Sequence, residues 1–208
     1  YNNFNKKFEK FKRLIIERKY EKLIKYNIDS IINYIKKTKT KISIKDLLFD
    51  FLHSRDNYFS SSHMKNNFKS KLDFKYYNFI YNFIIKLDDI SESSMYHFIN
   101  TITTINGGHK ILEKIKNNKK INIIKILKNQ INPMVVKENA ATYGTLLNFL
   151  WWNKNFPEEN FNIPFYKKIL MNSFRNSDDR IYKYLLKEII NPLPNSLKEK
   201  YLDTHVIN

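Results

Sequence analysis

The sequence predicts an all-α protein, built as an α-solenoid-like array of antiparallel helix pairs with about ten helices. Three observations predict this fold. The 208 residues include only 3 Gly and 5 Pro, too few for the many turns of an all-β fold. Apolar residues recur every three or four positions along most of the chain, which is the spacing of one helical face. No segment alternates apolar and polar residues in the manner of a half-buried strand.

The first residues are predicted to form a long basic amphipathic helix. Apolar side chains recur on one face and continue beyond it: Phe4, Phe8, Phe11, Ile15, Leu23 and Ile24. Basic side chains recur on another face and then extend the charge: Lys6, Lys10, Arg13, Arg18, Lys22 and Lys25. We expect the apolar side to dock on the rest of the protein, which leaves the cations facing outward.

A second helix is expected to begin at a cap, Asp29 or Ser30. Its inward residues are Ile31, Ile32 and Ile35, and the basic residues that end and follow it are Lys36, Lys37, Lys39 and Lys41. A Ser43-x-x-Asp46 capping pattern starts a third helix. We therefore expect a basic N-terminal helical segment over residues 1–54, a polar mobile connection over 55–71 and a helix-pair array over 72–208.

The array is expected to begin with a helix from Asp73, whose inward residues are Phe74, Tyr77, Tyr81, Ile84 and Ile85. Ser91 or Ser93 caps the next helix, whose inward residues are Met95, Phe98, Ile99, Ile102 and Ile105. Gly107-Gly108 closes it as a C-cap at positive φ. Two further helices carry Ile111, Leu112 and Ile115, then Ile121, Ile124, Leu127 and Ile131. Pro133 is expected to end the second of them.

A central pair of helices is predicted over Glu138–Trp152 and Pro164–Phe174. The expected inward face of the first helix is Tyr143, Leu146, Leu147 and Leu150. Trp151 flanks this face and Trp152 lies nearly opposite, so both are expected to pack against the next helix pair or a partner protein. Stacking of these indoles on RNA bases is the less favoured alternative. The last two helices are expected around Ile181–Ile189 and from Asn195 or Ser196 to Leu202.

The formal net charge is +17, from 37 Lys and Arg against 20 Asp and Glu. This excess favours a polyanionic partner: nucleic acid, an anionic membrane face or an acidic protein. An alternative source of the charge is an A/T-rich genome, since Lys, Asn, Ile, Tyr and Phe are the residues that A/T-rich codons encode. No apolar run approaches the roughly 20 residues of a transmembrane helix, so none is expected.

The sequence carries no pattern typical of an enzyme. It has no Cys, which excludes a disulfide scaffold, a cysteine zinc site and a cysteine nucleophile. The five His show no metal-binding spacing, and neither a Gly-x-Ser-x-Gly sequence nor a P-loop is present. We expect no catalytic residues, no metal and no cofactor.

One region shows a weak internal match and a family resemblance. An offset of 48 positions aligns Met95–Ile102 with Tyr143–Leu150. Residues Ala141–Leu150, Asn155-Phe156 and Phe165–Leu170 resemble a degenerate helix-pair unit of the heptatricopeptide and octotricopeptide type. Such units occur in organellar RNA-binding proteins, including those with RAP domains or FAST-kinase-like repeats. The resemblance implies organellar RNA work or a place in an organellar ribosome, while the absence of a RAP domain argues against a processing role.

These observations favour a structural RNA-binding scaffold in a large ribonucleoprotein, namely a mitochondrial ribosome. Contacts are expected to run from the cations listed above, Lys6 to Lys41, to RNA phosphates. The expected compartment is the mitochondrion, and otherwise the cytoplasm. The alternative is a helical scaffold or adaptor subunit of another complex that does not touch RNA.

Overall fold

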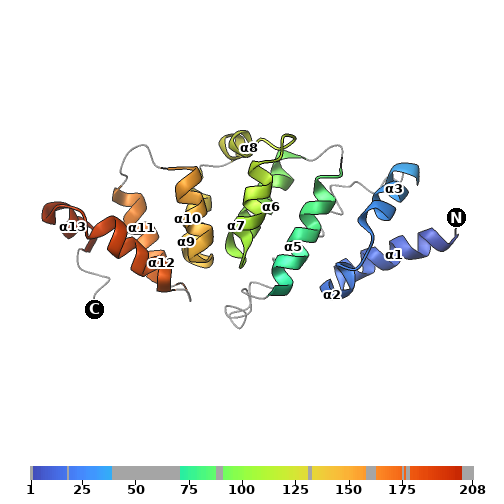
Figure 1. The fold of residues 1–208 in the computed structure, drawn as a ribbon, viewed down its shortest axis with the longest axis horizontal. Helices are drawn as coiled ribbons and strands as arrows, with labels where there is room; N and C mark the ends of the chain where they lie inside the picture. The colour runs from blue at the N-terminus through green and yellow to red at the C-terminus, as the bar shows by residue number, and fades with distance from the viewer. Residues whose placement is uncertain are drawn as a thin grey trace.

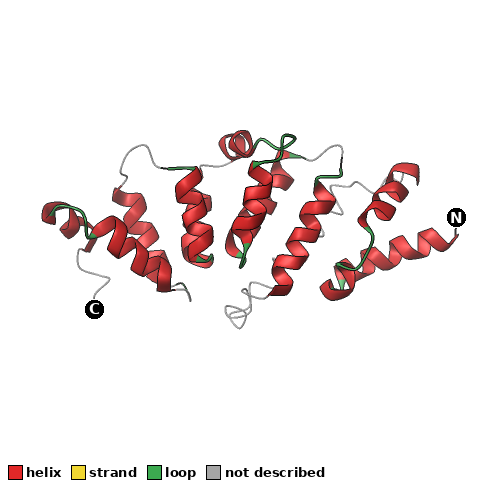
Figure 2. Cartoon of the chain, viewed as in Figure 1, coloured by secondary structure: helices red, strands yellow, loops and turns green. Residues whose placement is uncertain are grey.

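The computed structural model describes residues 2–17, 19–38, 71–87, 91–130, 133–157, 163–174, 176 and 179–202. Every regular element in these ranges is a helix and none is a strand (Figure 2). The all-α prediction is therefore confirmed. Twelve α-helices and one π-helical turn are present in the described ranges.

The helices follow one another along the long axis of an elongated molecule, with α1 to α3 at one end and α11 to α13 at the other (Figure 1). Their bounds are α1 (Asn2–Ile16), α2 (Tyr20–Leu23), α3 (Ile28–Thr38), α5 (Lys71–Ile84), α6 (Glu92–Thr104), α7 (Gly108–Lys116), α8 (Ile123–Gln130), α9 (Pro133–Tyr143), α10 (Leu146–Asn155), α11 (Ile163–Phe174), α12 (Asp179–Tyr184), η2 (Leu185–Ile190) and α13 (Asn195–Leu202). None of the described helices is long and apolar enough to cross a membrane.

Helices α1 to α3 form what we call the N-terminal unit. Its first part is not the single long helix that the sequence predicts. The chain turns between α1 and α2, and the amide of Lys19 donates to the carbonyl of Leu14 at 3.0 Å in that turn. The predicted inward residues Phe8, Phe11 and Ile15 are buried. The cap of α3 is Asn27, whose side-chain oxygen accepts from the amide of Ser30 at 3.1 Å, and not Asp29 or Ser30. The Phe11 ring lies 6.3 Å from the Phe83 ring, so this unit packs against α5.

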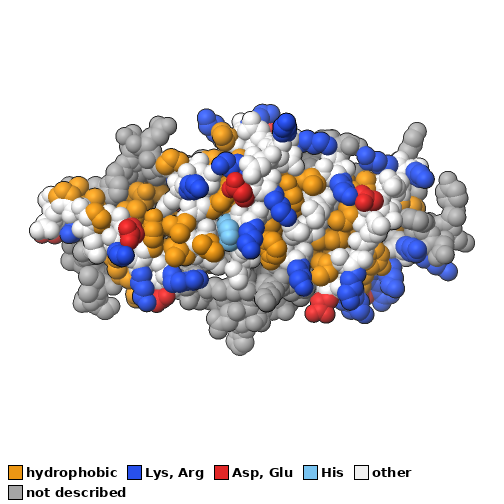
Figure 3. Space-filling view, viewed as in Figure 1, with side chains coloured by type: hydrophobic (Ala, Val, Ile, Leu, Met, Phe, Trp, Pro, Cys, Tyr) orange, Lys and Arg blue, Asp and Glu red, His pale blue; other side chains and the backbone are white. Residues whose placement is uncertain are grey.

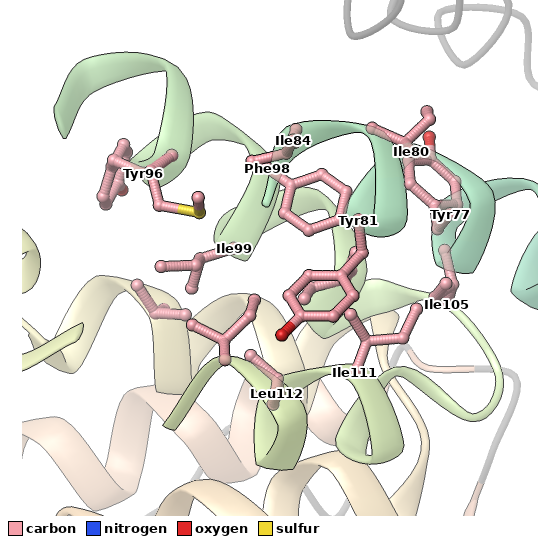
Figure 4. Close-up of a cluster of buried hydrophobic side chains, with 14 of the residues drawn as sticks. Tyr77, Ile80, Tyr81, Ile84, Tyr96, Phe98, Ile99, Ile105, Ile111 and Leu112 are labelled. Carbon is pink, nitrogen blue, oxygen red and sulfur yellow. The ribbon is translucent and has the colours of Figure 1, made fainter. Parts of the chain in front are cut away.

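The middle of the molecule is an apolar core between α5, α6 and α7 (Figure 4). Its buried side chains include residues from the predicted inward positions, among them Tyr77, Tyr81, Phe98, Ile99, Ile111 and Leu112. Four large aromatic residues that the sequence did not predict as inward are buried as well: Tyr76, Phe79, Phe83 and Tyr96. The hydroxyl of Tyr81 donates to the carbonyl of Lys114 at 3.2 Å, which joins α5 to α7. The predicted cap at Ser91 is confirmed, because its side chain accepts from the amide of Ser94 at 3.2 Å.

Gly107 and Gly108 form a tight turn between α6 and α7. Gly107 adopts the predicted positive φ, at 81°. Gly108 opens α7, and a Cβ added there would lie 1.8 Å from the carbonyl oxygen of Ile102. The pair therefore permits a positive φ and a close helix approach, and the C-cap of α6 itself is Ile105.

The predicted helix Glu138–Trp152 is in fact two helices, α9 and α10, that meet at Gly144. A Cβ at Gly144 would lie 2.5 Å from the carbonyl oxygen of Ala140 and 2.8 Å from that of Thr103. Thr145 then caps α10 by accepting from the amide of Asn148 at 3.4 Å. Pro133 begins α9, at a position where a proline needs no hydrogen bond, and does not end the preceding helix as predicted. Ile131, predicted inward, lies outside the described residues.

This break makes the predicted inward face of the central helix wrong at Tyr143 and Leu147, while Leu146 is partly buried against the core as predicted. Tyr143 is 61% exposed and Leu147 is 57% exposed. The buried residues of α10 are Asn148, Phe149, Trp151 and Trp152. The reason is that α10 starts afresh at Leu146, so the phase of α9 does not carry through. The 48-residue internal match fails for the same reason, since it aligns the buried Ile99 with the exposed Leu147. Ile124, predicted inward, is 53% exposed.

The C-terminal helices agree with the predicted order. Phe165, Ile169 and Leu170 bury one face of α11 against α9. The short α12 continues as the π-helical turn η2, and Ile181 and Leu185 are buried there. The predicted helix from Asn195 to Leu202 is α13.

Candidate nucleic-acid interface

Positive charge is concentrated in the N-terminal unit. Residues 1–38 hold eleven Lys and Arg against four Asp and Glu, an excess of seven out of the +17 of the whole chain. In Figure 3, Lys and Arg side chains gather around the end of the molecule that α1 to α3 form. Less than a fifth of the chain therefore carries about two fifths of its net charge.

Helix α1, α2 with the turn after it, and α3 line a groove of about 420 Å³. We call it the basic groove. Four of the ten residues that line it are lysines, three are aromatic and none is acidic. They are Lys7, Phe8, Lys10, Lys22, Lys25, Tyr26, Asn27, Ser30, Ile31 and Tyr34.

The local fold explains why these lysines converge. Phe8 and Phe11 are buried, which sets the rotation of α1 and brings Lys7 and Lys10 to one side of it. The turn after Ile16 reverses the chain, so that Lys22 and Lys25 reach the same groove. Asn27, Ser30 and Tyr34 follow the three- and four-residue spacing of one side of α3. The N-terminal turn of α3 adds its partial positive charge at the groove wall.

Three nearby carboxylates, those of Glu9, Glu17 and Asp29, are held by cations that do not line the groove, while Glu21 lies beside Lys22 in the sequence and is not a lining residue. Glu17 accepts from Arg13 at 2.5 Å and from Lys19 at 2.7 Å. The hydrogen bond from Lys19, and after it the one from Arg13, lower the pKa of Glu17 below its ordinary value. Glu9 pairs with Lys12 at 2.7 Å, and Asp29 pairs with Lys86 beyond α5. Among the described residues, no ion pair joins Lys10, Lys22 or Lys25 to a carboxylate.

The structure regroups the cations that the sequence singles out. It brings Lys10, Lys22 and Lys25 together in the basic groove. Lys6 is exposed on α1 outside the groove lining, and Arg13 is held by Glu17.

Three of the remaining predicted cations are outside the described residues: Arg18, Lys39 and Lys41. Lys36 and Lys37 are exposed in the last turn of α3. Sequence analysis missed Lys7 and the tyrosines of the groove. The spacing of these residues places them at the edges of helical faces, but it does not predict which edges come together after the chain turns.

Trp151 and Trp152 pack inside the chain. Trp152 is fully buried, and its indole N–H donates to the hydroxyl of Thr103 in α6 at 3.1 Å. The Trp151 indole donates to the carboxylate of Glu113 in α7 at 2.6 Å, and this bond lowers the pKa of Glu113. Their rings meet edge to face with centroids 5.0 Å apart. Both indoles thus serve helix packing, which leaves little of either ring to stack on an RNA base.

A larger cavity of about 560 Å³ lies between the end of α5, the start of α6 and α8. Its lining includes a cation and a carboxylate that neutralise each other, because Lys125 pairs with Glu92 at 2.9 Å. Lys120 is the other cation of this lining, so the cavity has two cations and one carboxylate, whereas the basic groove has four lysines and no acidic residue in its lining. The described part of the chain holds no cluster of three or more His, Asp or Glu side chains fit for a metal ion.

Comparison with protein-family models, with curated proteins and with solved structures finds no match to this chain. The geometry and charge of the basic groove therefore carry the functional proposal.

Proposed function

We propose that this chain is an RNA-binding scaffold subunit of a large ribonucleoprotein. The observation that carries the proposal is the basic groove, where lysines from α1, from α2 and from the turn after α2 converge without an acidic residue in the lining. Clustered lysines release counterions when they neutralise phosphates, and this supplies affinity without a base sequence. The proposal gives the chain no catalytic step, no metal and no cofactor.

We propose that the helices beyond α3 form an array of antiparallel pairs of the α-solenoid kind, which holds the groove in position within the particle. Helix α9 contacts both α10 and α11. Glu138 pairs with Lys168 at 2.7 Å, and Asn176, two residues past the end of α11, donates its side-chain amide to the carbonyl of Ala141 at 2.9 Å. The contact that lies later in α9 is made by the residue that lies later in the chain, past the end of α11, so α9 and α11 run in the same direction. Stacked units of this kind bury a continuous core and expose extended surfaces to partners.

We propose a mitochondrial ribosome as the ribonucleoprotein, with the mitochondrion as its compartment and the cytoplasm as the alternative. The resemblance of residues 141–170 to organellar helix-pair units supports this, together with the charge of the N-terminal unit. Purification of the tagged full-length chain from its own cells tests it. Ribosomal RNA and ribosomal proteins are expected to co-purify, and co-purification of proteins alone would contradict the proposal.

A second candidate is a scaffold that contacts proteins only. The observation that favours it is a set of large apolar side chains exposed on α9, α10 and α11: Tyr143, Leu147, Met171 and Phe174. Exposed apolar side chains of this size are typical of contacts with other subunits. This candidate predicts that ribonuclease treatment leaves the purified complex intact.

Salt dependence of RNA binding tests the first candidate. The groove variant replaces Lys7, Lys10, Lys22 and Lys25 with Gln. The control variant replaces four exposed lysines outside the N-terminal unit, Lys119, Lys120, Lys128 and Lys154, with Gln, so both variants lose the same charge.

Binding of a labelled oligonucleotide is measured from about 50 to 200 mM salt, and each lost phosphate contact flattens the slope of log affinity against log salt by roughly 0.7–0.9. The groove variant is expected to flatten the slope by roughly 3 and the control by much less. Equal slopes for the two variants would contradict the proposed function.

A further inference from the structure

The basic groove contains aromatic rings that phosphate contact alone does not require. Tyr26 and Tyr34 are half-buried and line the groove. The ring of Tyr34 lies 5.2 Å from that of Phe8 at a 42° tilt, and the ring of Tyr26 lies 5.4 Å from that of Phe11 at a 55° tilt. Each tyrosine is thus supported by a buried phenylalanine and also lines the groove.

Aromatic rings flanked by lysines are the combination that an unpaired nucleotide uses. A base stacks on an aromatic face whatever its identity, while the adjoining phosphates take the cations. Asn27 and Ser30 add polar groups to the same lining. The volume of about 420 Å³ falls within the roughly 300–1,000 Å³ of sites that hold small molecules.

We propose that the basic groove binds an unpaired nucleotide within a single-stranded RNA segment. Its base lies against Tyr26 and Tyr34, and its phosphates contact Lys7, Lys10, Lys22 and Lys25. This inference rests on the proposed RNA-binding function and adds that the bound RNA is single-stranded. A duplex keeps its bases stacked and paired, and so offers only phosphates and sugars to such a groove.

The test uses the full chain and three probes of matched charge: a short oligouridylate, the same backbone with abasic sites in place of the bases, and a duplex of equal phosphate number. Adenosine monophosphate serves as the probe for a free nucleotide. The wild type is expected to bind the oligouridylate roughly tenfold or more tightly than the abasic strand, since stacking on a ring stabilises each bound base. It is expected to prefer the oligouridylate to the duplex as well.

Two variants locate the effect. Tyr26→Phe/Tyr34→Phe keeps both rings and is expected to retain the preference for bases. Tyr26→Leu/Tyr34→Leu keeps apolar packing without rings, and is expected to bind both single strands with the affinity that the wild type shows for the abasic strand. Thermal unfolding monitors whether the Leu variant folds, and if it does not, the comparison of probes on the wild type still decides the inference.

The outcomes separate the inference from the proposed function. Equal, salt-dependent affinity of the wild type for the abasic strand and the oligouridylate would overturn the base contact and leave phosphate binding standing. Tighter binding of the duplex would also overturn the inference. Tight binding of adenosine monophosphate without added affinity for the oligonucleotide would identify a free nucleotide as the ligand and overturn the RNA assignment. Absence of binding to every probe would overturn both proposals.

Discussion

The side-chain amide of Asn148 donates a hydrogen bond to the backbone carbonyl of Ile105 at 2.6 Å, and this bond fastens α10 to the end of α6. The same amide nitrogen donates to the carbonyl of Thr103 at 2.8 Å. Its side-chain oxygen accepts from the amide of His109 at 2.9 Å. Asn148 is fully buried, and its one side chain satisfies three backbone groups where α6 ends and α7 begins.

Replacing Asn148 with Ala is expected to lower the free energy of unfolding by about 3 kcal/mol, because several buried polar groups lose their partners. Urea unfolding followed by circular dichroism measures the change. The matched control is Asn33→Ala at an exposed position of α3, which is expected to change it by less than about 0.5 kcal/mol. Equal stability of the two variants would contradict the role of Asn148 in fastening the helices.

Replacing Gly144 with Ala is expected to destabilise the protein by about 2 kcal/mol, the cost typical of an extra methyl group in a tightly packed site. The reason is that the new Cβ meets backbone, the carbonyl oxygens of Ala140 and Thr103, which cannot move aside as a flexible side chain does. The midpoint of thermal unfolding measures the effect. A variant that is as stable as the wild type would show that α6 and α9 do not approach as closely as described.

Stability is expected to fall at mildly acidic pH through His109. Burial lowers the pKa of His109 below its ordinary value of 6.5; the hydrogen bond with Asn148 raises it and the charge of Lys110 lowers it further. The unfolded chain therefore binds more protons than the folded chain from about pH 6.5 down to the folded pKa, and the free energy of unfolding decreases across that window. Below the folded pKa this loss is complete.

Urea unfolding of wild type and His109→Gln at about pH 7.5 and about pH 5.5 measures this contribution. The variant is expected to lose less stability between the two values than the wild type does. An identical loss would mean that His109 has the same pKa in the folded and unfolded chains.

Two cations that the sequence places on one face of α1 are expected to differ in RNA binding. Lys10 lines the basic groove, so Lys10→Gln is expected to flatten the salt slope by roughly 0.7–0.9. Arg13 is held by Glu17, so the charge-neutral double variant Arg13→Gln/Glu17→Gln is expected to leave the slope unchanged. Labelled oligonucleotide titrations measure both. The reverse order of effects would place the RNA on the Arg13 side of the helix.

Local patterns predicted much of this fold because their causes are local. The cap at Ser91 and the positive φ of Gly107 follow from side-chain and turn chemistry within a few residues. The break at Gly144 has a different origin, since one of its two close contacts is the carbonyl of Thr103, far away in the sequence. Periodicity alone predicts one continuous helix through Gly144. It therefore places Leu147 on the buried face, although Leu147 is exposed.

The candidate site was predictable only in part for a similar reason. Spacing identified a basic side of α1, and Lys10, Lys22 and Lys25 belong to the groove. It could not tell Lys7 from Lys6, because the choice depends on which edge of α1 the returning chain meets. The tyrosines of the groove carry no signal of their own in the sequence, since aromatic residues at helical spacing usually indicate core packing.

Cross-linking tests the location of the RNA contact most directly. Ultraviolet irradiation of the complex purified from cells, followed by mass spectrometry of the digested protein, identifies the residues that lie against RNA bases. Nucleotide adducts are expected on peptides that contain Tyr26 or Tyr34, and they are expected to disappear in the variant that replaces Lys7, Lys10, Lys22 and Lys25 with Gln. Adducts confined to the helices after α3, or unchanged adducts in that variant, would contradict the assignment of the basic groove as the RNA interface.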